Sequence, residues 1–203
     1  GEDLDVACPE PGAAAGCRVY VADRGANVVR LFRGDGTHLA NVAAPAPTSV
    51  VVLPDGEWAV ATARGPRLVQ VFDAQGRPVR EFGVPAEIAA TPEMNRFVNI
   101  GRLATDAAGH VYYAFSYRPE PSVRKYDRFG YAALEIELAT LDFLPAAQAI
   151  RREIARQDTR AGARAPVLEA VLRAVCVEGE SEEVWMAVGG RVELGGVVRD
   201  EGL

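Results

Sequence analysis

Short apolar runs separated by polar turns repeat along the chain in one arrangement. Each repeat has a strand with an aromatic residue among its first two positions, a short loop, a second apolar strand and a turn containing glycine. The repeats start at Val19, Trp58, Val111 and Val184, and their second strands cover 28–32, 68–72, 123–126 and 192–198. Apolar and polar residues alternate with the period of a β-strand, so the pattern predicts paired strands rather than helices.

The turns indicate how the strands are joined. Asp73–Gly76 and Asp127–Gly130 follow an Asp-x-x-Gly pattern, in which Asp starts a type I turn and glycine takes the left-handed position that closes it. One further strand is expected after each of the first three turns, at 37–42, 77–82 and 131–138, and one before each repeat, at 4–8, 50–53, 103–105 and 174–177. The unit is therefore four antiparallel strands joined by tight turns.

Four strands per unit, recurring with a period of about 40 residues, are typical of a β-propeller blade. A sandwich or a barrel would fit the density of strands but not their recurrence. We predict an all-β chain with one propeller domain over residues 1–203, with blades at about 4–42, 48–83, 102–138 and 174–203 and a helical insertion at 139–173. Tyr20, Trp58, Tyr112 and Trp185 are expected at equivalent positions, buried between blades.

Two stretches carry a resemblance to known propellers. Residues 19–23 followed by 27–32 resemble an NHL-type repeat, and residues 99–106 through 125–130 resemble bacterial six-bladed β-propeller proteins. The resemblance covers residues 4–138 well and 174–203 more loosely. It implies the fold and carries little about activity, because propellers of this kind have many unrelated roles.

Residues 139–173 depart from the blade pattern. Asp142 is suited to cap a helix with Pro145 in its first turn, and Phe143, Ala147, Ile150 and Ile154 fall on one helical face. A shorter helix is expected from Pro166 to Leu172.

Arg151, Arg152 and Arg156 lie off the apolar stripe of that insertion. Five arginines between 151 and 164 stand against Glu153 and Asp158, a local charge of +3. We interpret them as a docking arm for an acidic partner or an anionic membrane surface. The alternative is a solvated helix clipped to the edge of the blades.

The fourth repeat ends at Leu203, directly after its turn, so its outer strand is expected to be missing. Open sheet edges attract other chains. Three interpretations remain open: a truncated chain, a partner protein that completes or covers the edge, or an unusual four-bladed form.

Composition narrows the class of protein. The chain has 203 residues, is 49% hydrophobic and carries a formal charge of −6, which excludes general disorder and disfavours a nucleic-acid partner. Because no run approaches about 18 apolar residues, we expect no membrane-spanning segment, and association with a membrane-bound complex stays open. Among its 22 basic residues only Lys125 is lysine, and together with the many alanines this is typical of a bacterial protein from a GC-rich genome.

The cysteines bear on the compartment. Cys8 and Cys17 bracket a Pro-, Gly- and Ala-rich loop, so a hairpin would bring them within reach of a disulfide, with two free thiols as the alternative. A disulfide would place the protein outside the cytoplasm, in the periplasm or secreted. No signal peptide is recognisable after Gly1, which fits a removed presequence or a fragment. Cys176 lies in an apolar stretch and is expected to be a small buried residue.

Candidate chemistry is sparse. The two histidines, His38 and His110, cannot supply a three-histidine zinc site, and Asn99, Asp106 and Glu93 form the one cluster suited to a divalent ion in a central channel. We therefore expect no cofactor, no resident metal and no catalytic residue.

Arginine recurs in the loops between the second and third strands of the blades, which share one rim of a propeller. The predicted ligand- or partner-binding residues of this rim are Arg24, Asn27, Arg64, Arg67, Arg118 and Arg191. The arginine fork suits carboxylate or phosphate. The alternative is that these arginines only keep the loops soluble.

Two functions compete. The favoured one is a non-catalytic binding or scaffold propeller, a subunit of a larger protein assembly. The other is a propeller enzyme, a lyase or a lactonase-like hydrolase acting at a central metal, which rests on analogy of fold.

Overall fold

The computed structural model describes residues 4–7, 17–138, 144–158, 166, 168–178, 183–194 and 197–202. Side-chain surroundings are described for these residues apart from 4–7, 190–194 and 197–202.

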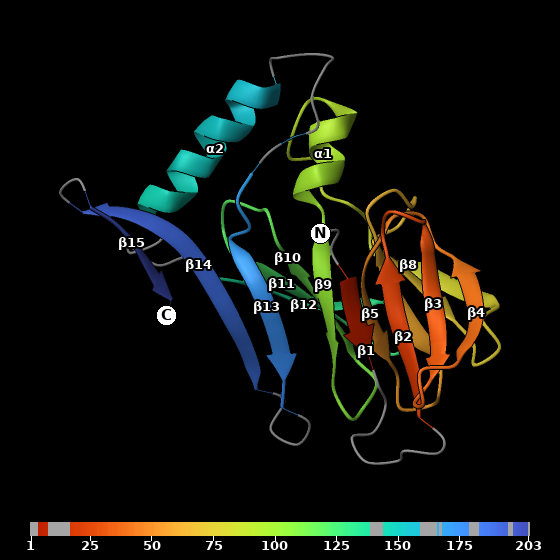
Figure 1. Cartoon of the computed structure of the whole chain (residues 1–203). Coiled ribbons are helices and arrows are strands. Elements are labelled where there is room, and N and C mark those ends of the chain that lie inside the picture. The colour runs from red at the N-terminus through yellow and green to blue at the C-terminus, as the bar shows by residue number, and fades with distance from the viewer. Residues whose placement is uncertain are drawn as a thin grey trace.

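Four antiparallel sheets, named here blades 1 to 4, follow one another along the chain (Figure 1). Blade 1 holds β1 (Leu4–Ala7), β2 (Arg18–Asp23), β3 (Val28–Arg33) and β4 (His38–Ala43). Blade 2 holds β5 (Pro47–Val52), β6 (Trp58–Thr62), β7 (Val69–Phe72) and β8 (Pro78–Phe82). Blade 3 holds β9 (Gly101–Thr105), β10 (Val111–Phe115), β11 (Ser122–Tyr126) and β12 (Ala132–Glu137), and blade 4 holds β13 (Leu172–Val177), β14 (Val184–Leu194) and β15 (Val197–Gly202).

The glycine turns have the predicted geometry. Gly76 has φ of 80° and donates its N–H to the Asp73 carbonyl at 2.9 Å, and Gly130 repeats this with Asp127 at φ of 95°. The ladders shift register just before these turns, between Val71 and Phe72 and between Lys125 and Tyr126. A type I turn closed by a left-handed glycine produces such a bulge, so this part of the sequence interpretation is confirmed.

Hydrophobic cores fill the spaces between consecutive blades. The clusters join blade 1 to blade 2 around Trp58, blade 2 to blade 3 around Tyr113, and blade 3 to blade 4 around Tyr112. Each blade in the middle of the row is therefore apolar on both faces, which explains why all five residues of β6 and of β10 are buried.

The strand period of two decides which blade each aromatic residue meets. Tyr20 and Tyr112, 3% and 1% exposed, face the following blade. Trp58 is fully buried but packs in the core with blade 1, so it faces the preceding blade. The predicted equivalence of Trp58 is therefore wrong, because it stands at the first position of its strand and the other aromatics stand at the second.

Trp185 corrects the same prediction in another way. It occupies the second position of its repeat, like Tyr20 and Tyr112, but is 65% exposed. Its neighbours Val184 and Met186 pack against blade 3. Trp185 thus points to the side where a following blade would lie.

Blade 4 also differs from the prediction in its strands. Residues 188–191 continue β14 instead of forming a loop, and β14 pairs with β13 through its first half and with β15 through its second half. Arg199–Gly202, expected as a turn, belongs to β15. Gly189 and Gly190, which lie where the loop was expected, both pair with β15.

Two helices lie above one end of the sheets (Figure 1). α1 (Pro92–Val98), which the sequence interpretation missed, begins after Thr91, whose hydroxyl accepts the Met94 N–H. α2 (Leu144–Asp158) buries Ala147 and Ile154 as its predicted stripe requires. The second helix expected up to Leu172 is wrong, because residues 168–170 are not helical and β13 begins at Leu172.

The helices pack on each other. Met94 and Val98 of α1 share a buried cluster with Ile154 of α2. The Asp158 carboxylate accepts the N–H groups of Ala90 at 2.6 Å and Thr91 at 2.8 Å, which ties the end of α2 to the start of α1.

Candidate functional site

The outward side of blade 4 forms a small exposed apolar surface. Trp185 lies directly opposite Cys176 in the ladder, and Ala187 lies opposite Ala174. Directly opposite residues share a face of the sheet, and all four of these are exposed. We call this set the open face.

The open face corrects the expectation for Cys176. Its thiol is free and exposed rather than buried. The apolar stretch around it is half-buried because Val175 and Val177 pack on blade 3, while Cys176 points the other way. Successive side chains of a strand point to opposite faces of the sheet, so only every second residue enters a given core. The sequence does not show which face of the sheet a neighbouring blade covers.

The second surface lies where the innermost strands of blades 2, 3 and 4 begin, close to α1, and we call it the mouth. One pocket of about 310 Å³ reaches from the start of β5 to the start of β13, and its lining is Thr48, Ile100, Gly101, Arg102, Ser116, Tyr117, Ala170, Leu172 and Arg173. A second pocket of about 230 Å³ is lined by Arg24, Ala63, Arg64, Glu93, Arg96, Phe97, Ile100 and Pro166. Ile100 lines both pockets, so they adjoin.

The structure brings two of the predicted rim arginines together. Arg24 from the β2–β3 loop and Arg64 from the β6–β7 loop line the same pocket, as a shared rim requires. Arg96, Arg102 and Arg173 join them in the two pockets but were missed from the sequence. They lie on α1 and at the starts of two inner strands, and only the alignment of the inner strands side by side would have pointed to them.

Other predicted rim residues lie elsewhere. Arg67 is exposed but lines neither pocket, and Arg191 lies inside β14 opposite Asp200 rather than in a loop. Asn27 holds the connection between blades 1 and 2. Its left-handed backbone, with φ of 56°, lets its side-chain oxygen accept the Ala46 N–H at 3.0 Å.

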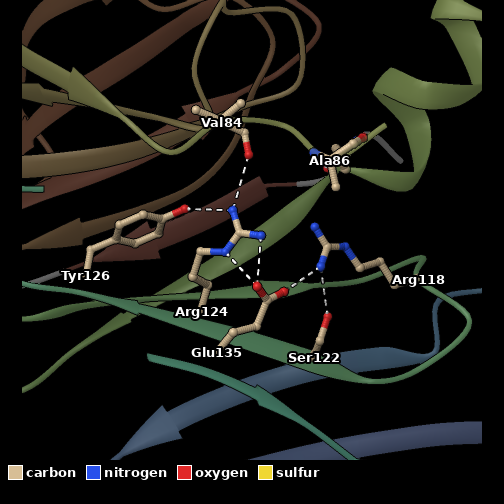
Figure 2. A network of polar contacts seen from close by, with 8 residues as sticks. Val84, Ala86, Arg118, Ser122, Arg124, Tyr126 and Glu135 are labelled. Carbon is tan, nitrogen blue, oxygen red and sulfur yellow. Dashed lines mark hydrogen bonds and ion pairs between the residues drawn. The ribbon is translucent and has the colours of Figure 1, made fainter. Parts of the chain in front are cut away.

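Arg118 belongs to a polar network between blades 2 and 3, shown in Figure 2. It donates to Glu135 at 2.8 Å and covers the Phe115 ring, 3.2 Å from its centre. Arg124 donates to the same carboxylate, to the Val84 carbonyl at 3.2 Å and to the Tyr126 hydroxyl. Burial alone would raise the pKa of Glu135. The guanidinium groups of Arg124 and Arg118 lower it by more than burial raises it, so the pKa lies below its ordinary value and the carboxylate is held ionised. Arg118 therefore braces strands within blade 3, and Arg124 links this network to the segment that follows blade 2.

The arginines of α2 are largely matched by acids. Arg151 pairs with Glu120, and Arg156 donates to Glu153 at 2.7 Å. Arg152 is exposed. The positive charge that favoured a docking arm is thus reduced at Arg151 and Arg156, two of the three arginines predicted to bind a partner.

The three residues considered for a divalent ion, Asn99, Asp106 and Glu93, do not lie together. Asn99 precedes β9 and Asp106 follows it, so they stand at opposite ends of the strand. The Asn99 amide bonds to the backbone of Ala86, and Glu93 pairs with Arg96. Over the part of the chain whose side chains are described, no group of three or more His, Cys, Asp or Glu residues is placed to hold a metal ion.

Asp106 instead organises a hairpin. Its buried carboxylate accepts the His110 N–H at 2.9 Å, contacts the His110 ring nitrogen at 2.7 Å and accepts the Tyr112 hydroxyl at 3.0 Å. Burial alone would raise its pKa, but these bonds outweigh burial and lower it.

Two further expectations concern disulfides and membranes. Cys8 lies outside the described residues, so its bond to Cys17 stays a prediction. Neither of the two described helices has the length and apolarity needed to cross a membrane.

No protein-family model and no curated protein sequence matches the chain. Among solved structures, virginiamycin B lyase from Staphylococcus aureus, an inactive variant with quinupristin, matches with a TM-score of 0.55 and 13% identity, over 96% of this chain and 57% of that one. A protein of unknown function from Bacteroides caccae gives a TM-score of 0.47 and 20% identity, over 66% of this chain and 45% of that one. Regucalcin, a calcium-binding protein from Agrobacterium tumefaciens, gives a TM-score of 0.40 and 17% identity, over 62% of this chain and 42% of that one.

The chain spans about half the length of these structures, with 42% to 57% of each covered. Virginiamycin B lyase and regucalcin are six-bladed β-propellers. At such low identity the likeness to the lyase bears on the fold and not on its activity. Consecutive antiparallel blades of three or four strands, stacked through apolar faces, together with the likeness to the lyase, establish that the chain has an all-β propeller fold.

Proposed function

We propose that this protein is a non-catalytic binding propeller, a subunit of a larger assembly, which packs the open face of blade 4 against another polypeptide chain. The observation that carries the proposal is the 65% exposure of Trp185. At the equivalent position Tyr20 and Tyr112 are 3% and 1% exposed, because a following blade covers them.

The chemistry of the open face supports a protein partner. Its four side chains, Ala174, Cys176, Trp185 and Ala187, are uncharged, and tryptophan is enriched in the centres of protein interfaces. Small residues around one large ring leave room for an opposing sheet to approach closely. The expected partner surface is the apolar face of another antiparallel sheet, stacked as consecutive blades stack here.

Sedimentation equilibrium tests the proposal. The purified chain is expected to show a mass above the 21.7 kDa of one copy, or to bind a co-expressed partner stoichiometrically. Trp185→Ser should return it to 21.7 kDa, because it removes most of the apolar area of the open face.

Tyr131→Ser is the matched control. Tyr131 is 73% exposed but lies in the turn before β12, away from the open face, so its loss should leave the association unchanged. A stable monomer of the unaltered chain that binds no second polypeptide would refute the proposal. So would equal effects of the two substitutions.

A further inference from the structure

The described lining of the mouth is rich in arginine. Five arginines, Arg24, Arg64, Arg96, Arg102 and Arg173, line its two pockets, and Glu93 is the one acidic residue among the described lining residues. The chain as a whole carries −6. Positive charge concentrated in a concave site raises the local concentration of anions.

The two pockets divide this charge between them. Arg102 and Arg173 line the larger pocket, and none of its described lining residues is acidic. Arg24, Arg64 and Arg96 line the smaller one, where Glu93 pairs with Arg96 at 3.0 Å. Arg64 and Arg173 are exposed, so a ligand can reach their guanidinium groups from solvent.

An apolar wall stands between the charged ends. Phe97 lines the smaller pocket and Tyr117 the larger, and their ring centres lie 4.5 Å apart. Ile100, 7% exposed, lines both pockets. A ligand that bridges the pockets therefore meets arginine, then aromatic and aliphatic surface, then arginine again.

We propose that the mouth binds an acidic peptide in which carboxylates stand on both sides of an apolar side chain. The two carboxylates would meet the arginines of the two pockets, whose planar forks match carboxylate geometry. The apolar side chain would lie against Phe97 and Tyr117. The volumes of about 310 and 230 Å³ suit a ligand of a few residues. The described lining of the mouth shares no residue with the open face, although Arg173 of the mouth lies next to Ala174 of the open face on β13.

Calorimetric titration with a capped Asp-Phe-Asp peptide tests the proposal. The capped Asn-Phe-Asn peptide keeps the shape and removes the charge, and the capped Asp-Gly-Asp peptide keeps the charge and removes the apolar side chain. We expect the first peptide to bind at least about tenfold more tightly than either of the others, and its affinity to fall as salt rises.

Arginine variants locate the site. Arg64→Gln and Arg173→Gln should each weaken binding of the Asp-Phe-Asp peptide about three- to fivefold, the modest effect expected of exposed ion pairs. Arg67→Gln is the matched control, because Arg67 is an exposed arginine of the same β6–β7 loop that lines neither pocket. The affinity of the Arg67→Gln variant for the Asp-Phe-Asp peptide should be unchanged. Since all three side chains are exposed, the variants are expected to fold.

Three results would overturn the proposal. The first is no measurable binding of the Asp-Phe-Asp peptide at millimolar concentration. The second is equal binding of the charged and uncharged peptides. The third is a loss in Arg67→Gln as large as in Arg64→Gln. Binding of free glutarate as tightly as the peptide would instead assign the site to a small dicarboxylic acid and overturn the peptide as its ligand.

Discussion

Replacing either of the two tryptophans by alanine should have very different effects on the stability of the chain. Trp58 is fully buried, its ring stacks on Phe72 with centres 4.4 Å apart, and it contacts Tyr20 at 5.2 Å. Its indole nitrogen donates to the Asp73 carbonyl at 2.8 Å. Trp185 has 65% of its surface in water.

The magnitudes follow from these contacts. Trp58→Ala removes a large buried side chain, which costs about 3–5 kcal/mol of unfolding free energy. Loss of the aromatic contacts and of the partner of the Asp73 carbonyl puts the expected value at the upper end of that range. Trp58→Phe keeps a ring in the core and should cost about 1–3 kcal/mol. Trp185→Ala, made at a surface position, should change the stability of the single chain by less than about 0.5 kcal/mol.

Urea unfolding followed by far-ultraviolet circular dichroism measures all three variants without relying on tryptophan fluorescence. The expected order of stability is the unaltered chain and Trp185→Ala together, then Trp58→Phe, then Trp58→Ala. Measurements at low protein concentration keep association out of the comparison. Equal losses for Trp58→Ala and Trp185→Ala would refute the assignment of one face as covered and the other as open.

Further predictions concern the hairpin carboxylate, the cysteines and one buried glycine. Asp106→Asn should lose about 1–3 kcal/mol near neutral pH. Because the pKa of Asp106 is lowered in the folded chain, its stabilisation is present above the ordinary value of 3.8 and is lost as the pH falls through the folded pKa, so urea midpoints of the variant and the unaltered chain should converge in acid. Cys8 and Cys17 should resist a thiol-blocking reagent in the denatured, unreduced chain while Cys176 reacts, and reaction of three thiols would exclude the bond. Gly101→Ala should destabilise the fold by about 1–3 kcal/mol, since the new methyl group would stand 2.4 Å from the Ala114 carbonyl oxygen, and an unchanged melting temperature would contradict that crowding.

The sequence predicted the features that depend on local chemistry. The glycine turns followed from Asp73–Gly76 and Asp127–Gly130, because the left-handed position that closes such a turn favours glycine. The stripe of α2 followed from the spacing of Ala147 and Ile154. The structure of these elements is determined by residues that lie within a few positions of one another in the sequence.

The features that depend on neighbouring blades could not be read in the same way. Trp58 and Tyr20 look alike in the repeats, but one position of offset sends a side chain to the opposite face of a strand. Trp185 is exposed because no blade among the described residues follows blade 4, which is not a property of its own segment.

The arginines of the mouth likewise include some that the sequence predicted and some that it did not. Arg24 and Arg64 were predicted, since loops at the same place in successive repeats meet on one rim. Arg96, Arg102 and Arg173 were not, because no element was predicted between the blades at 48–83 and 102–138 and the inner strands were not aligned with one another. Where those strands begin decides which arginines reach the mouth.

Acrylamide quenching of Trp185 fluorescence tests the central claim most directly. In the Trp58→Phe variant Trp185 is the only tryptophan, so its quenching reports on the open face alone. The claim predicts strong quenching in the dilute single chain and a several-fold weaker quenching once sedimentation shows that the chain has associated. Trp185→Phe, which leaves the buried Trp58, should be quenched weakly under both conditions. Association that leaves Trp185 as accessible as in the single chain would contradict the claim.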